Sequence, residues 1–191
     1  MEPMITPAVI NRLKEGDLAA FDEIYLATIQ KVYYTVYVLA SNKQEVDEMV
    51  NEIYFQVWKS ISNYDDSKPF LFWLNGLVFR QIKNWKLKAW KRMELIQKLK
   101  KVNKEEVNVY DDERMKSTNK QWVSSMIDTL PYKLKAVLFL YYFYEYSLNE
   151  IASVLNIPLG TVKSRHHTAI QFLRKKYGHS IDKGEAGIYE C

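Results

Sequence analysis

Apolar residues recur at steps of three and four through the first half of the chain, which is the spacing of one face of an α-helix. The pair Gly16 and Asp17 separates a short first helix from a second, since glycine ends helices and an aspartate side chain caps them. The pattern predicts helices over 18–39 and 44–59, a loop over 63–69 and a further helix that Phe70 opens. The inward positions predicted for 18–39 are Leu18, Phe21, Ile24, Tyr25, Ile29, Val32, Val36 and Leu39.

The second half of the chain predicts shorter helices. One contains Trp122, Met126, Ile127 and Leu130, and Pro131 begins the next, where its missing N–H costs little. That helix breaks near Tyr146. Two more follow, from Leu148 to Leu155 and from Leu159 to Lys176, joined by the turn Asn156-Ile157-Pro158.

These elements predict an all-α protein with two helical domains. The chain has 191 residues, 48% of them apolar, with only 6 Gly and 5 Pro, which is too few for the turns of an all-β fold. Between the two sets of helices the apolar period fades and charged residues accumulate, as in a flexible linker. The predicted divisions are a first domain over 1–92, a linker over 93–117, a second domain over 118–177 and a flexible tail over 178–191.

Cysteine content and the amino terminus bear on location. The single cysteine, Cys191, excludes a disulfide framework and a cysteine-based zinc site within the chain. The first ten residues are acidic and interrupted by prolines, unlike a signal peptide. We therefore expect a cytoplasmic protein.

The net charge of +4 conceals opposed patches. Between Arg80 and Lys104 there are ten Lys/Arg and one acid, a net charge of +9. A second basic, acid-free stretch lies within 151–181. Two basic patches separated by an acidic segment favour contact with a polyanion, although charge alone leaves a merely solvated face equally open.

The helix predicted over 44–59 carries an acidic stripe opposite its apolar face. Glu45, Glu48 and Glu52 lie at i, i+3 and i+7, with Asn51 beside them, so they share one side of the helix. This stripe is a candidate surface for a protein partner. The alternative is that these acids only keep the helix soluble.

The sequence Ser147-Leu148-Asn149-Glu150 has the spacing of a capping box, in which serine and glutamate satisfy each other's backbone N–H groups. A capped short helix, a brief turn and a basic second helix match a helix-turn-helix, whose second helix enters the major groove of DNA. An ordinary helical hairpin with a basic face is the alternative. The outward positions near the start of the second helix, with Arg165 at the border of its inward face, are Lys163, Ser164, Arg165, His167, Thr168 and Gln171.

The chain resembles a known family over about residues 10–177. The segment from Leu130 to Leu173, which contains NEIASVLNIPLGTVKSR, resembles the carboxy-terminal promoter-binding domain of the extracytoplasmic-function (ECF) sigma factors of bacterial RNA polymerase. EVDEMVNEIYFQVWKSI followed by FLFWLNGLVFRQIKNW is similar to the amino-terminal domain of that family. The resemblance implies a sigma-70-type fold with regions 2 and 4 only.

The resemblance also implies roles for particular residues. In the family, the polar face of the helix matching 44–59 binds the β′ clamp helices of core polymerase, and the second domain binds the β flap. The polymerase-binding positions are then Glu45, Glu48, Asn51 and Glu52, with Asn51 where glutamine is common. The family's minus-ten reader holds a flipped base of the non-template strand, and its matching positions are Tyr64, Lys68, Phe70, Arg80, Lys83 and Asn84.

The minus-thirty-five positions implied by the family are those of the second basic helix, including Lys163, Arg165 and His167. Thr168 stands where arginine is often found, and His166 where a leucine packs inward. His166 and His167 point about 100° apart on a helix, so they do not form a two-ligand metal site.

The expected function is that of a dissociable initiation factor: it binds core RNA polymerase and promoter DNA, has no catalytic activity, and uses no metal, cofactor or small-molecule substrate. The resemblance implies control by an anti-sigma factor, often membrane-bound. An autonomous, dimeric helix-turn-helix regulator is the first alternative, and it would bind duplex DNA without polymerase. A nuclease or recombinase is the second, but it requires clustered carboxylates for metal, which the sequence does not provide.

Overall fold

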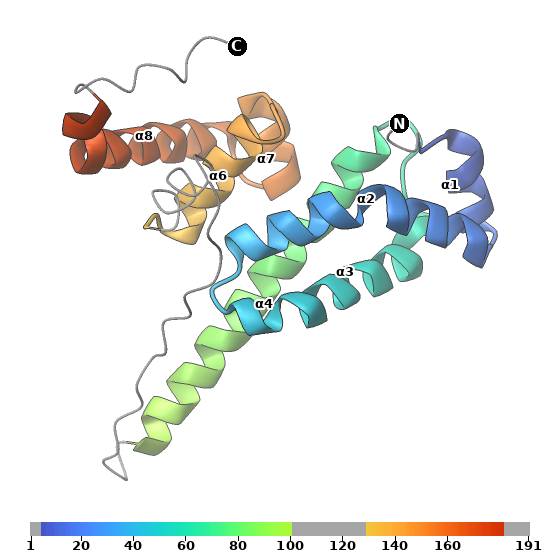
Figure 1. Cartoon of the computed structure of the whole chain (residues 1–191), viewed down its shortest axis with the longest axis horizontal. Helices are drawn as coiled ribbons and strands as arrows, with labels where there is room; N and C mark the ends of the chain where they lie inside the picture. The colour runs from blue at the N-terminus through green and yellow to red at the C-terminus, as the bar shows by residue number, and fades with distance from the viewer. Residues whose placement is uncertain (1–4, 101–128, 182–191) are drawn as a thin grey trace. The chain divides into compact units, whose positions relative to one another are not determined.

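A computed structural model of the chain describes residues 5–100 and 129–181. The chain divides into two compact units, Met1–Met115 and Lys116–Cys191, each with its own helices. Every regular element of the described residues is helical, as the sequence predicts (Figure 1). Unit 1 contains α1 (Pro7–Lys14), α2 (Leu18–Leu39), η1 (Lys43–Glu45), α3 (Val46–Ser60), η2 (Ile61–Asn63) and α4 (Phe70–Lys100). Unit 2 contains α6 (Tyr132–Tyr142), α7 (Leu148–Leu155) and α8 (Leu159–Ile181).

The core of unit 1 lies where α2, α3 and α4 pack together. Each helix buries one stripe of apolar side chains, as the three- and four-residue spacing predicts. A buried hydroxyl pair joins two of the helices, with Thr28 Oγ1 2.7 Å from Tyr54 Oη. Thr28 also donates to the carbonyl of Ile24, so both polar groups are satisfied inside the core. The fully buried aliphatic residues of this core include Ile24, Val32, Val36, Ile53, Val57, Val78 and Ile82.

One inward position predicted for α2 is wrong. Leu18 is 67% exposed, whereas Ala20 is completely buried. Leu18 is the first residue of the helix, directly after its cap, and the buried stripe instead follows steps of four from Ala20 through Ile24 and Thr28. The buried face of α2 therefore begins at Ala20, whose small side chain is a weak signal in the apolar pattern, and not at Leu18.

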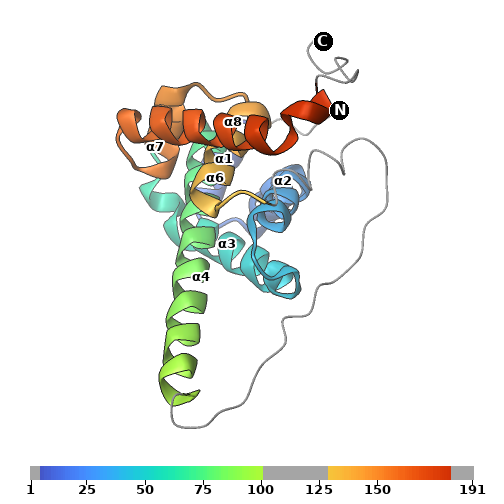
Figure 2. The same ribbon diagram turned by 90° about the vertical axis from the view of Figure 1, so that its left-hand side faces the viewer.

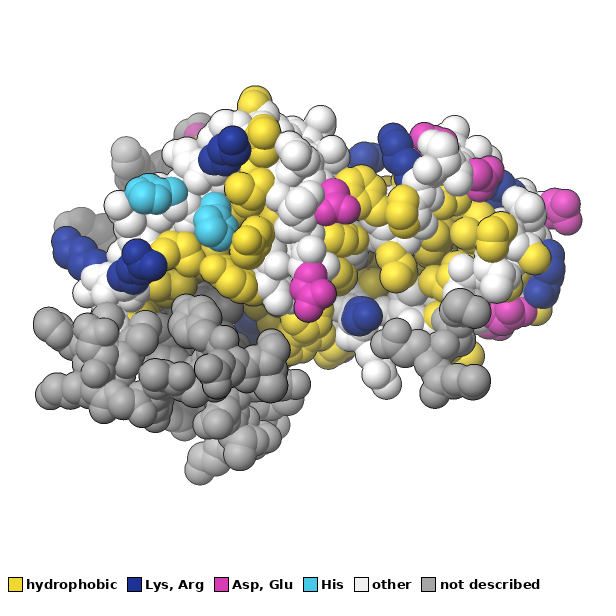
Figure 3. Space-filling model, turned by 90° about the horizontal axis from the view of Figure 1, so that it is seen from above, with side chains coloured by type: hydrophobic (Ala, Val, Ile, Leu, Met, Phe, Trp, Pro, Cys, Tyr) yellow, Lys and Arg dark blue, Asp and Glu magenta, His cyan; other side chains and the backbone are white. Residues whose placement is uncertain are grey.

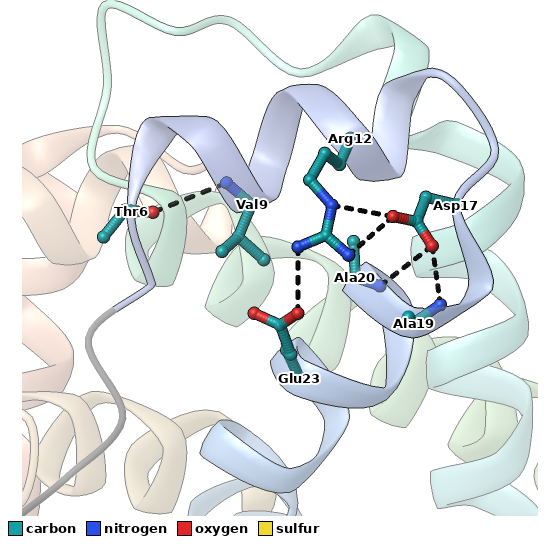
Figure 4. Close-up of polar contacts among 7 residues, drawn as sticks. All are labelled: Thr6, Val9, Arg12, Asp17, Ala19, Ala20 and Glu23. Atoms are coloured by element: carbon teal, nitrogen blue, oxygen red, sulfur yellow. Dashed lines mark hydrogen bonds and ion pairs between the residues drawn. The ribbon is translucent and has the colours of Figure 1, made fainter.

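The junction between α1 and α2 is held by a small polar network (Figure 4). Asp17 caps α2 as predicted, because its Oδ1 accepts from the backbone N–H groups of Ala19 and Ala20. Its other oxygen accepts from Arg12 Nε at 2.7 Å, while Arg12 Nη1 donates to Glu23 at 2.9 Å. The hydrogen bond from Arg12 lowers the pKa of Asp17. Gly16, with φ +88°, makes the turn that allows this arrangement.

α4 and α8 end later in the chain than the sequence predicts, and α6 ends earlier. α4 continues to Lys100, past the first-domain limit of 92, and α8 continues to Ile181, past Lys176. α6 ends at Tyr142 rather than near Tyr146, because Glu145 takes a left-handed φ of 56° and Tyr146 N–H donates back to the Leu140 carbonyl. The rest of the predicted linker and the helix predicted around Trp122, Met126 and Ile127 lie outside the described residues, as does the tail beyond 181.

Candidate nucleic-acid interface

Unit 2 contains the predicted helix-turn-helix, formed by α7 and α8. Both hydrogen bonds of the capping box are present: Glu150 N–H donates to Ser147 Oγ at 3.3 Å, and Ser147 N–H donates to Glu150 Oε2 at 2.8 Å. The Ser147 hydroxyl also donates to Glu150 Oε2 at 2.7 Å, and this bond, together with the one from the Ser147 N–H, lowers the pKa of Glu150. Asn156 ends α7 in the left-handed conformation, with φ 50°. The Pro158 carbonyl then accepts hydrogen bonds from the N–H groups of Thr161 and Val162, in the first turn of α8.

The sequence correctly predicts which face of α8 points inward. Val162 and Ala169 are fully buried, and Ile170 and Leu173 are half-buried. Ala169, with Leu130 and Leu138, forms the core against which Ile170 and Leu173 pack. The predicted outward residues Lys163, Ser164, His167, Thr168 and Gln171 are all exposed, while Arg165 is half-buried.

His166 occupies the border of that inward face, against the end of α6. Its ring lies 4.7 Å from the Tyr141 ring and 6.2 Å from the Tyr142 ring, measured between centroids. Its Nε2 is buried and has no hydrogen-bond partner in the described part of the chain. Burial lowers the pKa of His166, and the neighbouring His167 lowers it further. Figure 3 shows histidine side chains, in cyan, beside yellow hydrophobic ones.

In unit 1 the loop before α4 is built around an aromatic cluster. Tyr64 and Phe70 are only 7% and 6% exposed, and their rings lie 5.6 Å apart. The half-buried Trp73 completes the cluster, 5.4 Å from Tyr64 and 5.5 Å from Phe70. Tyr64 O–H also donates to the Lys68 carbonyl. Tyr64 and Phe70 therefore pack beneath the loop and support it.

Polar contacts fix the exposed part of the same loop. Asp65 accepts from the backbone N–H and the hydroxyl of Ser67, and these bonds lower the pKa of Asp65. Lys68 Nζ lies 3.5 Å from Asp65 Oδ2, with its side chain 61% exposed. Lys14, at the end of α1, pairs with Asp66 at 2.6 Å and lies 5.3 Å from the centre of the Tyr64 ring. Lys14 is not among the predicted site residues, because no local sequence signal relates it to Asp66, which is 52 positions away.

α4 carries the remaining predicted minus-ten residues on its outer face. Arg80, Lys83 and Asn84 are exposed, whereas the neighbouring Phe79 and Ile82 are buried. Trp85 is half-buried, with Lys88 Nζ 6.0 Å from its ring centre. Trp90 is 63% exposed.

The acidic stripe lies on the outer face of η1 and α3. Glu48 and Asn51 are exposed, whereas Glu45 and Glu52 are half-buried. Glu52 accepts a hydrogen bond from Gln56 at 2.9 Å. Glu45 is the last residue of the 3-10 turn η1 rather than part of the α-helix predicted over 44–59, so the stripe begins one residue before α3.

Neither a membrane span nor a metal cluster is found in the part of the chain that the structure describes. No helix there is long and apolar enough to cross a membrane. No group of three or more His, Cys, Asp or Glu side chains within 5–100 and 129–181 is placed to hold a metal ion.

Comparison with known proteins matches both units. Residues 24–92 match the family model for sigma-70 region 2, and residues 126–175 match the model for sigma-70 region 4. The two matches together span more than half of the chain. The chain is 28% identical over 190 residues to the ECF RNA polymerase sigma factor SigW of Bacillus subtilis, covering 92% of this chain and 98% of SigW.

Solved structures show the same fold. A structure of CnrH in complex with the cytosolic domain of CnrY matches with a TM-score of 0.63 and 16% identity, over 92% of this chain and 99% of that one. The sigma factor RpoE, in complex with the anti-sigma factor NepR from Bartonella quintana, matches with a TM-score of 0.63 and 17% identity, over 81% and 94% of the two chains. With region 2 in unit 1 and region 4 in unit 2, the chain belongs to the ECF sigma factors of bacterial RNA polymerase.

Proposed function

We propose that this sigma factor binds core RNA polymerase and directs it to promoters that contain a minus-ten and a minus-thirty-five element. The observation that carries this proposal is the occurrence, in one chain, of a region 2 unit and of a region 4 unit whose α8 exposes a basic face. A single-unit regulator needs only the second of these. The chain is then an initiation factor with no catalytic activity, substrate or cofactor of its own, acting in the cytoplasm.

We assign minus-thirty-five recognition to α8. An α-helix fits the major groove, and side chains near its first turns reach base edges. Lys163, Ser164, His167, Thr168 and Gln171 are exposed over that part of α8, with Arg165 at its edge. Arg174, Lys175 and Lys176 are exposed farther along and meet phosphates, which position the helix without reading sequence.

We assign minus-ten recognition to the loop before α4 and the outer face of that helix. Lys68, Arg80, Lys83 and Asn84 offer exposed cations and an amide to the displaced strand. Unstacking a base costs a few kcal/mol, so the surface that receives it must be held in place beforehand. The buried Tyr64 and Phe70 serve this purpose by fixing the loop.

We assign polymerase binding to the acidic stripe Glu45, Glu48, Asn51 and Glu52, with the β′ clamp helices as its partner, and the β flap as a partner of unit 2. Carboxylates grouped on one helix face, with Glu48 exposed and Glu45 and Glu52 half-buried, favour a basic protein surface and repel DNA. The stripe and the outward residues of α8 therefore select different partners.

We also propose that an anti-sigma factor holds the chain inactive. RpoE, which shares its fold, is described in complex with the anti-sigma factor NepR. The described residues carry several exposed apolar side chains, including Leu26 at 71% and Phe55 at 58%, which an inhibitor has available to cover. Such an inhibitor is often membrane-bound in this family.

Run-off transcription with core polymerase on a promoter library tests the function directly. We expect transcripts only when core and this chain are both present, and only from a subset of promoters. A footprint on duplex DNA by the chain alone, unchanged by core, would instead identify an autonomous regulator. Magnesium-dependent strand cleavage would identify an enzyme.

A further inference from the structure

α1 lies outside the residues that match sigma-70 region 2, but it belongs to the same compact unit. The match begins at residue 24, inside α2, whereas α1 spans Pro7–Lys14. A helix of eight residues is not stable alone in water. α1 buries Ile10 and Leu13, and it packs against α2 and against η2, the turn directly before the loop that leads into α4. Its position therefore bears on both of these elements.

The end of α1 is fixed to α2 by the turn at Gly16 and by the side chain of Arg12 (Figure 4). The Arg12 carbonyl accepts from the N–H of Asp17 at 3.0 Å, which closes the turn around the left-handed Gly16. The Arg12 guanidinium contacts Asp17 through Nε at 2.7 Å and Nη2 at 2.6 Å, and Glu23 through Nη1 at 2.9 Å. One planar group thus joins α1 to the cap and to the second turn of α2, in a geometry that a lysine cannot reproduce.

Lys14 leaves α1 on the opposite side from Arg12. The two residues are two positions apart, which is about 200° around a helix. Lys14 Nζ lies 2.6 Å from Asp66 Oδ2 and 5.3 Å from the centre of the Tyr64 ring, and both partners belong to the loop before α4. Figures 1 and 2 show α1 at the end of unit 1 where α4 begins. α1 therefore bridges two elements, with Arg12 on α2 and Lys14 on the loop.

We propose that α1 positions the loop before α4 for minus-ten recognition, and that Arg12 is a positioning residue for this step. Ion pairs that are exposed to this degree add little to folding stability, but a bidentate contact fixes orientation. A flipped base needs a receiving surface that is already in place, because unstacking the base is itself costly. The inference rests on the proposed function, and in it Arg12 acts through Lys14 and not by contact with DNA.

The test uses a ratio of transcripts, because a merely structural role would lower transcription from every promoter alike. Run-off transcription with core polymerase compares two promoters that differ only in the minus-ten element, present together in one reaction. We expect Arg12→Gln to lower the ratio of strong-element to weak-element transcripts by about two- to fivefold, as for the loss of a partly exposed ion pair. The matched control Lys59→Gln, which removes one charge from an exposed position of α3, should leave the ratio unchanged.

Two further variants separate positioning from a loss of the fold. Glu23→Gln keeps the Asp17 cap and removes one arm of the network, so it should lower the ratio in the same direction but by less. Arg12→Gln combined with Lys14→Met should lose no more of the ratio than Lys14→Met alone, because both changes act on one contact. Thermal unfolding of each variant shows that the fold is kept.

Two outcomes would overturn the inference. One is an unchanged ratio in both Arg12→Gln and Glu23→Gln. The other is a loss in the double variant equal to the product of the single losses, which would mean that Arg12 and Lys14 act independently. The proposed function fails in a different way, if the wild-type chain with core gives no transcript or gives equal transcripts from the two promoters.

Discussion

Lys14 and Asp66 form an ion pair of 2.6 Å that joins the end of α1 to the loop before α4, across 52 positions of sequence. The lysine side chain is 23% exposed and the aspartate 64% exposed. The same ammonium lies 5.3 Å from the centre of the Tyr64 ring, so Lys14 contacts the loop through both charge and ring face. α1 thereby restrains the segment to which we assign minus-ten recognition.

Replacing this lysine tests whether the restraint serves promoter recognition. We expect Lys14→Met to lower minus-ten-dependent transcription by about fivefold, the equivalent of ~1 kcal/mol, because the loop loses a fixed position. The loss of folding stability should stay below about 1 kcal/mol, as for other partly exposed pairs. Lys14→Arg should restore most of the activity. Equal run-off transcript yields from Lys14→Met and wild type would show that the pair is only structural.

Reversing charge on α3 tests the polymerase-binding assignment. Glu48 is exposed, so Glu48→Lys should leave the fold intact. We expect affinity for core polymerase to fall by about tenfold or more, since a repulsive contact replaces an attractive one. Asp22→Lys, an exposed acid on α2, is the matched control. Co-purification of the Glu48→Lys variant with core at wild-type yield would rule out this contact.

Two cations of α8 should differ in their effect on promoter choice. Replacing Arg165 should weaken promoters with a good minus-thirty-five element by about tenfold, the cost of roughly 1–3 kcal/mol for a lost base contact. Replacing Lys176 should weaken all promoters slightly and equally, because it meets phosphates. Competition between promoters in one transcription reaction measures both. The same loss for both variants would contradict the assignment of Arg165 to a base contact and of Lys176 to a phosphate contact.

Replacing His166 should change how the stability of unit 2 depends on pH. The folded-state pKa of His166 is lowered by burial against Tyr141 and Tyr142, so the unfolded state binds its proton more readily. Stability therefore falls as pH drops through about 6.5, until the folded-state pKa is also passed. We expect His166→Leu to flatten this dependence and to raise the free energy of unfolding by about 1 kcal/mol, because an unpartnered Nε2 is removed.

Hydrogen exchange of the α6 and α8 amides, at about pH 7.5 and about pH 5.5, measures the stability of unit 2 separately from that of the rest of the chain. His167→Gln is the control, since that side chain is exposed. If the stability of unit 2 depended on pH in the same way in His166→Leu and in wild type, the titrating group would be a residue other than His166.

The helices and their inward faces were largely predictable from sequence, because apolar period and caps are local signals. The capping box of Ser147 and Glu150 and the buried Val162 and Ala169 of α8 are confirmed on that basis. Contacts between distant segments were not predictable. Sequence marked Tyr64 and Phe70 as aromatic residues in a loop, but their burial depends on packing against Trp73.

The predicted ends of α4 and α6 differ from the structure for a similar reason. α4 continues past 92 because no glycine or proline occurs between Leu77 and Lys100, and the rise in charge over that segment does not interrupt the helix. α6 ends early because Glu145 adopts a left-handed conformation, which glutamate gives no reason to expect. Charge indicates what a surface contacts, but it does not end a helix.

Because α4 is one uninterrupted helix, it sets both the distance and the rotational phase between the loop at its start and the residues along its far half. One residue inserted between Trp85 and Lys88 would move the far half by only 1.5 Å but turn it by about 100°. Seven inserted residues would move it by about 10 Å yet return it to within about 20° of its present direction. The number of residues along α4 is therefore constrained by angle more than by length, even at positions whose own side chains are exposed.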